Sequence, residues 1–168
     1  MPQSLAGLPR RLLSVVYEAL LLAAVLFVAN FLLLPIVSAA PSPDVRVLAI
    51  PDVPTRALLF CTLFAVAALY FVCSWTGGRR TLPMKTWRMR LVDRDGGPVS
   101  YKRAFIRYLA AWIGPALALL SYAALRRQGL GPVAVALCAL NYVAALADPA
   151  AQFLHDRIAG TRIIKETV

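Results

Sequence analysis

Four long apolar stretches, separated by polar segments, dominate the pattern of the chain. They cover approximately residues 12–34, 57–75, 104–125 and 130–147. The hydrocarbon core of a bilayer is about 30 Å thick, and a helix needs about 20 apolar residues to cross it. The first three stretches meet this requirement, and the fourth is the shortest. We therefore predict four transmembrane helices, with a buried or re-entrant segment as the alternative for residues 130–147.

The first apolar stretch begins like a secretion signal. Arg10 and Arg11 precede it, and small residues follow it in the sequence Val37-Ser38-Ala39-Ala40-Pro41. The apolar part of a signal peptide spans about 7–15 residues, whereas this stretch is longer and contains Glu18. We expect it to be retained as the first transmembrane helix, with cleavage as the alternative.

The overall composition favours a membrane protein over a soluble one. Of 168 residues, 60% are apolar and 15% are charged, whereas soluble domains carry about 25% charged residues. The net charge of +10 is also found in nucleic-acid-binding proteins, but it arises equally when short cytoplasmic loops of a membrane protein are kept positive. In so apolar a chain we expect a bilayer as the partner and no nucleic acid.

The distribution of basic residues predicts the orientation in the membrane. Residues 76–103 contain eight lysines and arginines against two aspartates, which places this loop in the cytoplasm. Four crossings then put both termini in the cytoplasm and residues 35–56 outside. The outer segment contains five prolines, which disfavour a helix and favour an extended link. Arg126 and Arg127 fall outside, but the other loops outweigh them.

The cytoplasmic loop has the pattern of a short β-hairpin. Residues 86–92 (TWRMRLV) alternate apolar and basic side chains, the period of a half-buried strand. The sequence Asp93–Pro98 is typical of a tight turn, and Ser100 is suited to cap the third helix. We therefore predict one all-α membrane domain over residues 1–168, with a β-hairpin-like cytoplasmic loop and a cytoplasmic tail from residue 148.

Glu18 is the most informative polar residue, because it lies six residues inside the first apolar stretch, about 9 Å deep in a helix. An ionisable side chain at this depth usually faces a partner or a water-filled cavity. Arg11 lies seven residues earlier on the same helix face, and Arg107 enters the third helix at a similar depth. One interpretation is a structural salt bridge between Glu18 and Arg107. The other is a carboxylate that binds a proton or a cation.

The tail brings two further charges to the same membrane boundary. Asp156 and Arg157 belong to an amphipathic segment that returns to the cytoplasmic face. We expect one group of charges there, serving either as an ion or proton site or as a structural cluster. Its members are Arg11, Glu18, Arg107, Asp156 and Arg157. His155 is the only histidine in the chain, and we expect no metal site.

The basic side chains of the cytoplasmic loop are candidates for contacting anionic lipid headgroups, which stabilise such contacts by about 1 kcal/mol per well-placed side chain. These residues are Arg79, Arg80, Lys85, Arg88 and Arg90. The chain has no glycine-rich phosphate loop, nucleophile motif or zinc signature. We therefore expect neither an enzyme nor a cofactor.

Small and polar residues in the later stretches predict helix packing. Asn30 and Asn141 are expected to form hydrogen bonds between helices. Ala110, Gly114 and Ala118 form a stripe of small residues at four-residue spacing, which allows close helix contact. The sequence Gly114-Pro115 predicts a kink in the third helix.

Three parts of the sequence resemble the RDD family of small integral membrane proteins. The first is PRRLLSVVYEALLL, in which Arg11 is followed by Glu18 where the family usually has aspartate. The second is the loop from Arg79 to Leu109, and the third is FLHDRIAGTRII, with Asp156 as the second acid. The resemblance covers about residues 8–164. It implies a protein of the bacterial inner membrane, with transport as a role proposed for some members.

Two functions follow as expectations. The first is a small transport component in which Glu18 and Asp156 exchange protons or bind a cation such as sodium, while the arginines tune their charge. Four helices enclose little pathway, so this role favours a homo-oligomer. The second is a non-catalytic membrane scaffold or assembly factor, whose basic loop docks anionic lipid or a partner and whose acids hold the helices together.

Overall fold

The computed structural model describes residues 5–37 and 52–166. Most of the proline-rich link predicted for residues 35–56, and residues 38–41 of the signal-like sequence, lie outside this part of the chain. Two of the five prolines lie within helices instead of the link. Pro54 occupies the first turn of a helix, where its missing N–H breaks no hydrogen bond, and Pro35 occupies the last turn of another.

The first helical hairpin consists of α1 (Leu8–Val37) and α2 (Val53–Trp75). Both are long and apolar enough to cross a membrane, and the 30 residues of α1 extend about 45 Å. In the most apolar window of each helix only 6% of residues are buried. These helices therefore expose their apolar side chains outward, as helices facing lipid do. Asn30 is exposed as well and, contrary to expectation, forms no hydrogen bond between helices among the described residues.

The third predicted span is a kinked helix made of α4 (Tyr101–Ala111), α5 (Ile113–Leu125) and η1 (Arg126–Gln128). Together these 28 residues are also long and apolar enough to cross a membrane. Pro115 has no N–H to donate to the carbonyl of Ala111, and Asn141 Nδ2 donates to that carbonyl at 2.8 Å instead. The predicted hydrogen bond of Asn141 is therefore made to the carbonyl group that the predicted kink leaves free.

The fourth apolar stretch is a shorter, irregular helix that does not confirm a fourth span. It consists of α6 (Gly131–Ala134), η2 (Val135–Ala139) and α7 (Leu140–Ala147), and its apolar length is 17 residues or fewer. It packs tightly on α5, because a Cβ on Gly114 would lie 2.7 Å from the carbonyl oxygen of Leu137. Within the described residues, three helices reach membrane-spanning length.

The remaining elements form a small polar domain at one end of the helices. They are α3 (Leu82–Thr86), β1 (Met89–Asp93), α8 (Leu154–Ala159) and β2 (Thr161–Lys165). The core beneath them joins apolar residues of both halves of the chain. It is formed by Trp75, Met84, Met89, Leu91, Val99, Tyr108 and Ile163.

The predicted local β-hairpin is wrong, because β1 pairs with the tail rather than within its own loop. The strands β1 and β2 are antiparallel, with Leu91 opposite Ile163. The turn after β1 does not return as a strand, because Asp93 Oδ1 accepts from the backbone N–H of Gly97 and the chain then enters α4. Ser100 caps that helix, as predicted, by accepting from Arg103 N.

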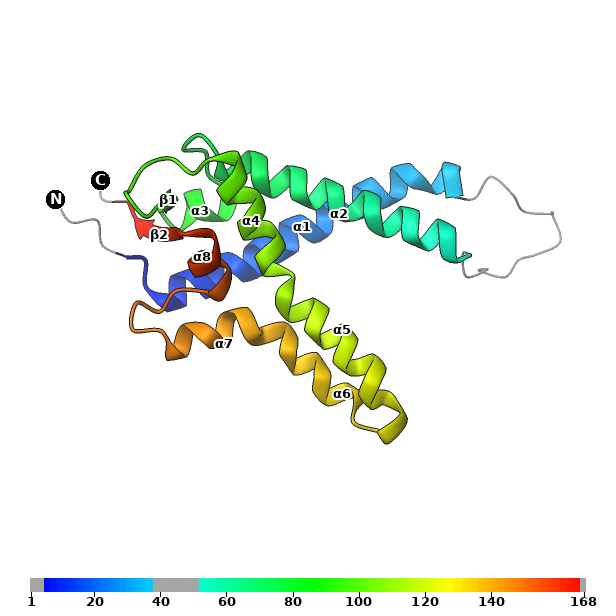
Figure 1. Cartoon of the computed structure of the whole chain (residues 1–168). Helices are drawn as coiled ribbons and strands as arrows, with labels where there is room; N and C mark the ends of the chain where they lie inside the picture. Colours follow the sequence, from blue (N-terminus) through cyan, green and yellow to red (C-terminus); the bar gives the residue numbers. More distant parts are fainter. Residues whose placement is uncertain (1–4, 38–51, 167–168) are drawn as a thin grey trace.

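The two helical hairpins leave the polar domain in different directions (Figure 1). The hairpin α1–α2 extends to one side, while α5 to α7 run off at an angle to it. The described ends of the chain lie side by side, because Leu5 forms a β-bridge with Ile164 and Ala6 N donates to Ile163 O at 3.0 Å. The polar domain therefore gathers both ends of the chain at the base of the hairpins.

Candidate functional site

A buried ion pair joins α4 to α8 at the centre of the molecule. Arg107 Nε donates to Asp156 Oδ1 at 2.7 Å, and the two side chains are 5% and 0% exposed. The guanidinium carbon of Arg107 also lies 4.0 Å from the centre of the Trp75 ring, a cation–π contact that partly compensates the lost hydration. Three elements, α2, α4 and α8, thus surround this one positive charge.

The environment of Asp156 keeps its carboxylate charged. Burial alone would raise the pKa of Asp156, but attraction to Arg107, with smaller contributions from His155 and Arg11, holds the pKa below its ordinary value. Thr161 Oγ1 also donates to Oδ1 at 3.3 Å. The other oxygen, Oδ2, is buried and has no hydrogen-bond partner among the described residues.

His155 lies beside this pair as a neutral imidazole. Burial lowers its pKa to about 4, although the charge of Asp156 opposes the shift. Its Nε2 is 3.8 Å from Asp156 Oδ1. Within the described part of the chain, no three His, Cys, Asp or Glu side chains lie close enough together to hold a metal ion.

Arg11 is buried, but its guanidinium donates to backbone carbonyl groups rather than to a carboxylate. Its Nε donates to Ala6 O at 2.6 Å and one terminal nitrogen donates to Ala151 O at 2.7 Å. Arg11 therefore ties the start of the chain to the segment that connects α7 and α8. Asp156 and Asp148 are near enough for their charges to act on it.

Glu18 is a half-buried residue of α1, on the side of the helix that carries the buried residues Arg11 and Ser14. Its carboxylate is beside the Thr81 side chain and within electrostatic range of Arg107. The predicted salt bridge between Glu18 and Arg107 is not formed, since Arg107 pairs with Asp156. Glu18 Oε1 is buried and has no hydrogen-bond partner in the described structure.

Arg157 is the one member of the predicted charge cluster that stays outside it. Its side chain is 63% exposed and lies 3.4 Å from Asp148 Oδ1. Successive residues of the short helix α8 point in different directions, so Asp156 faces inward while Arg157 faces the surface. The structure thus brings together Arg11, Glu18, Arg107 and Asp156.

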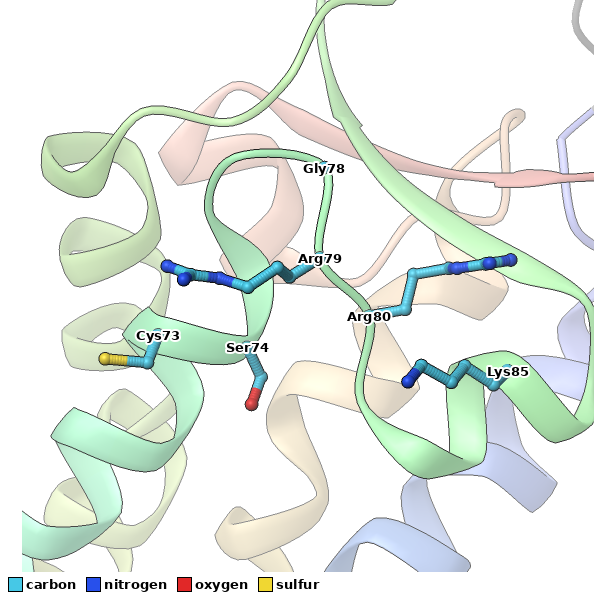
Figure 2. Close-up of a pocket in the computed structure, with 6 residues that line it drawn as sticks. All are labelled: Cys73, Ser74, Gly78, Arg79, Arg80 and Lys85. Carbon is cyan, nitrogen blue, oxygen red and sulfur yellow. The ribbon is translucent and has the colours of Figure 1, made fainter.

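The five basic loop residues do not form one surface. A cavity of about 400 Å³ lies at the end of α2. Figure 2 shows that the Lys85 ammonium and the Ser74 hydroxyl point into this open space. The guanidinium groups of Arg79 and Arg80 point away in opposite directions. Arg80 forms an ion pair with Glu166, and Arg79 donates to Thr76 Oγ1 at 2.9 Å.

The other two basic loop residues lie near β1. Arg88 is exposed, with a positive φ of 50°, and its carbonyl accepts from Glu166 N. Arg90 is half-buried in the strand, and its Nε has no partner among the described residues. The five basic residues therefore lie in several different environments, and their contact with lipid headgroups stays a prediction.

Two contributors to the site were not predicted from the sequence. Thr81 caps α3 by accepting from Met84 N, and the same cap places its side chain beside Glu18. The sequence Thr81-Leu82-Pro83 carries the signal, since a threonine at the N-cap followed by a proline in the first helical turn is a typical helix start. Trp75 carries no comparable signal, because only the folded structure places its ring on Arg107.

One of three comparisons with known proteins finds a family for the chain. The model of the RDD family matches residues 5–160, a range that contains Arg11, Glu18, Arg107 and Asp156. A comparison with curated proteins and one with solved structures each find no match. The family match covers more than half of the chain. The chain therefore belongs to the RDD family of membrane proteins.

Proposed function

We propose that this protein is a small, non-enzymatic transport component that exchanges a cation such as sodium for a proton at Glu18. The observation that carries the proposal is that Glu18 Oε1 is buried and unpartnered, although Arg107 lies within electrostatic range. Asp156 Oδ1 instead forms an ion pair with Arg107 Nε, at 2.7 Å. That ion pair uses Arg107 Nε, and no ion pair joins Arg107 to Glu18 in the described structure, so the Glu18 carboxylate can take another cation.

The physical basis is the cost of a buried carboxylate oxygen that lacks a cationic partner, since the side chain beside the carboxylate is the neutral Thr81. A carboxylate out of water must acquire a proton, a cation or hydrogen-bond donors to offset its lost hydration. Arg107, Arg11, Asp156 and Glu18 sum to zero net charge when all four are ionised. A proton or a sodium ion on Glu18 changes this sum by the same amount, so the two compete for one position.

The shape of the molecule supports a homo-oligomer. The hairpins α1–α2 and α5–α7 leave the polar domain in different directions (Figure 1), and the apolar windows of α1 and α2 are only 6% buried. One copy of the chain therefore does not enclose a route from Glu18 across a bilayer. Association of several copies would enclose such a route.

We also propose a bacterial inner-membrane location, with both termini in the cytoplasm and Gly131–Ala147 as a fourth crossing. The eight basic residues of 76–103 support a cytoplasmic polar domain. The pairing of β1 with β2, and of Leu5 with Ile164, supports a common side for both ends, because strands on opposite sides of a bilayer cannot pair.

The test is sodium-driven proton flux in proteoliposomes that contain the full chain and a trapped pH indicator. We expect Glu18→Gln to lower the flux at least about tenfold, since an amide accepts no proton in exchange. The matched control is Asp95→Asn, which makes the same chemical change at an exposed turn and should leave the flux unchanged. Equal flux in Glu18→Gln and the parent, with equal amounts of folded protein, contradicts the proposal.

A scaffold role is the second candidate, and the cavity of Figure 2 favours it. An ammonium and a hydroxyl that face an open space at the end of a membrane helix suit an anionic headgroup or partner. In that case Glu18 only holds helices together. Loss of folded protein in Glu18→Gln, with no sodium-dependent flux in the parent, would favour the scaffold.

A further inference from the structure

A second basic cavity, of about 250 Å³, lies in the polar domain where α8 meets β2. It does not include the residues of the cavity in Figure 2. The residues that line it come from the turn after β1, the connection from α7, the end of α8 and the start of β2. They are Arg94, Gln152, Asp156, Arg157, Gly160, Thr161 and Arg162.

The three arginines of this cavity are poorly neutralised. Within the described residues, Arg94 and Arg162 form no ion pair, and Arg157 reaches only Asp148, at 3.4 Å. Arg162 Nε is buried and without a hydrogen-bond partner. A buried donor without an acceptor is costly. An acceptor atom of a bound ligand would offset this cost for Arg162 Nε.

The fold brings these arginines together from distant parts of the chain. The β1–β2 register places Asp93 opposite Thr161 and Val92 opposite Arg162, so Arg94 and Arg162 lie at the same end of the sheet. Gly160 ends α8 with a φ of 66°. A Cβ at Gly160 would lie 3.0 Å from Arg94 Nε, so the absence of a side chain leaves room for that guanidinium.

Asp156 adds an acceptor to the cavity. Its side chain is fully buried and lines the cavity, and its Oδ2 has no hydrogen-bond partner among the described residues. An ammonium donor is disfavoured there, because Arg107 already pairs with Asp156 and three further arginines line the same cavity. A neutral hydroxyl satisfies the oxygen without adding positive charge.

We propose that this cavity binds a phosphate ester that carries a hydroxyl group, as in glycerol phosphate. The arginines hold the phosphate through charge-assisted hydrogen bonds, and the hydroxyl donates to Asp156. Gln152 and Arg157 place the cavity next to Asp148, directly after the apolar helix α7. A lipid headgroup and a free phosphate ester both have this chemistry. The proposal goes beyond cation exchange and does not involve Glu18.

The experiment measures binding of fluorescent phosphatidylglycerol to the full chain in neutral detergent. The test variant is the double substitution Arg94→Gln and Arg162→Gln. The control is Arg126→Gln and Arg127→Gln, which removes the same charge at the exposed η1 turn. We expect the test variant to weaken binding on the order of tenfold, the control to change it little, and both to unfold at the temperature of the parent.

Ligand analogues test the rest of the site and its natural source. Phosphatidylethanol, a phosphodiester of the same charge whose headgroup has no hydroxyl, should bind more weakly than phosphatidylglycerol. Displacement by soluble glycerol 3-phosphate would identify a free phosphate ester as the ligand, and failure of displacement would identify the lipid. Equal loss of binding in the test and control variants, or undiminished binding in the test variant, overturns the proposal.

Discussion

Arg107 is the residue on which the charges of the site depend. It lies within electrostatic range of both Glu18 and Asp156, yet it forms its ion pair only with Asp156. Removing one partner of a buried pair leaves the other charge uncompensated. At the scale of single residues, this unequal sharing separates the two acids: Asp156 forms an ion pair with Arg107, and Glu18 forms no ion pair in the described structure.

The first prediction concerns this ion pair. Asp156→Asn and Arg107→Gln should each destabilise the protein by about 3–5 kcal/mol, because each leaves an uncompensated buried charge. Thermal unfolding in detergent measures the change. The double substitution Arg107→Met with Asp156→Leu removes both charges and should recover a large part of the loss. A single variant as stable as the parent would show that the pair contributes little.

The second prediction concerns the pH dependence of stability. Burial lowers the pKa of His155 to about 4 in the folded protein, against about 6.5 in an unfolded chain. Between these values the unfolded state binds more protons, so stability falls as the pH falls from about 6.5 to 4. The pKa of Asp156 is below its ordinary value, so its own contribution is lost only below about pH 4.

The measurement is the unfolding temperature of the parent and of His155→Gln across that pH range. The parent should lose on the order of 3 kcal/mol, from about 1.4 kcal/mol per unit of pKa shift, and the variant should show a flatter profile. Parallel profiles for the two proteins would assign the pH dependence to other groups.

At the scale of elements, the kink between α4 and α5 is stabilised by a neighbouring helix. Pro115 leaves the carbonyl of Ala111 without its helical partner, and Asn141 of α7 donates to it at 2.8 Å. The same contact brings the backbone of η2 against Gly114. The kink and the packing of the fourth apolar helix are therefore one structural unit, which has to form together.

The third prediction tests that unit. Gly114→Ala should destabilise the protein by about 1–3 kcal/mol, because its Cβ would lie 2.7 Å from the Leu137 carbonyl oxygen and the two helices would have to separate. The control is Ala116→Val on the exposed side of the same helix. Thermal unfolding that is lowered equally in both variants would indicate a general effect of side-chain size.

The three long apolar helices were predictable from the sequence, whereas the pairing of the sheet and the choice of ion pair were not. Hydrophobic length alone predicted the spans near residues 12–34 and 57–75, and Pro115 predicted the kink. The partner of β1 lies in the tail, with Asp93 opposite Thr161, and no local pattern specifies so distant a pairing. Depth along a helix placed Glu18 near Arg107, and the return of the tail to the same boundary placed Asp156 there. Only the folded structure shows which acid pairs with Arg107.

At the scale of the whole molecule, the two hairpins diverge from one polar domain (Figure 1). The polar domain is well packed, with Met89, Val92 and Asp156 fully buried, while the helices expose most of their apolar surface. A single copy thus consists of a polar domain and two helical hairpins that are separated from each other. An exchange function therefore requires that the hairpins of several copies associate.

The fourth prediction is that the active form is an oligomer. In nanodiscs of phosphatidylethanolamine and phosphatidylglycerol, single-molecule photobleaching of labelled chains should show several bleaching steps per disc. Sodium-dependent flux in vesicles should depend on protein density more steeply than linearly. Single bleaching steps, together with full flux at one chain per vesicle, would contradict this prediction.

The most direct test of the central claim is proton release when sodium is added to the purified chain in weakly buffered detergent. If sodium and a proton compete for Glu18, addition of sodium releases protons from the parent and from Asp95→Asn, but not from Glu18→Gln. The account predicts that result. Equal release from Glu18→Gln and the parent, or no release from the parent at any pH at which it is folded, would contradict it.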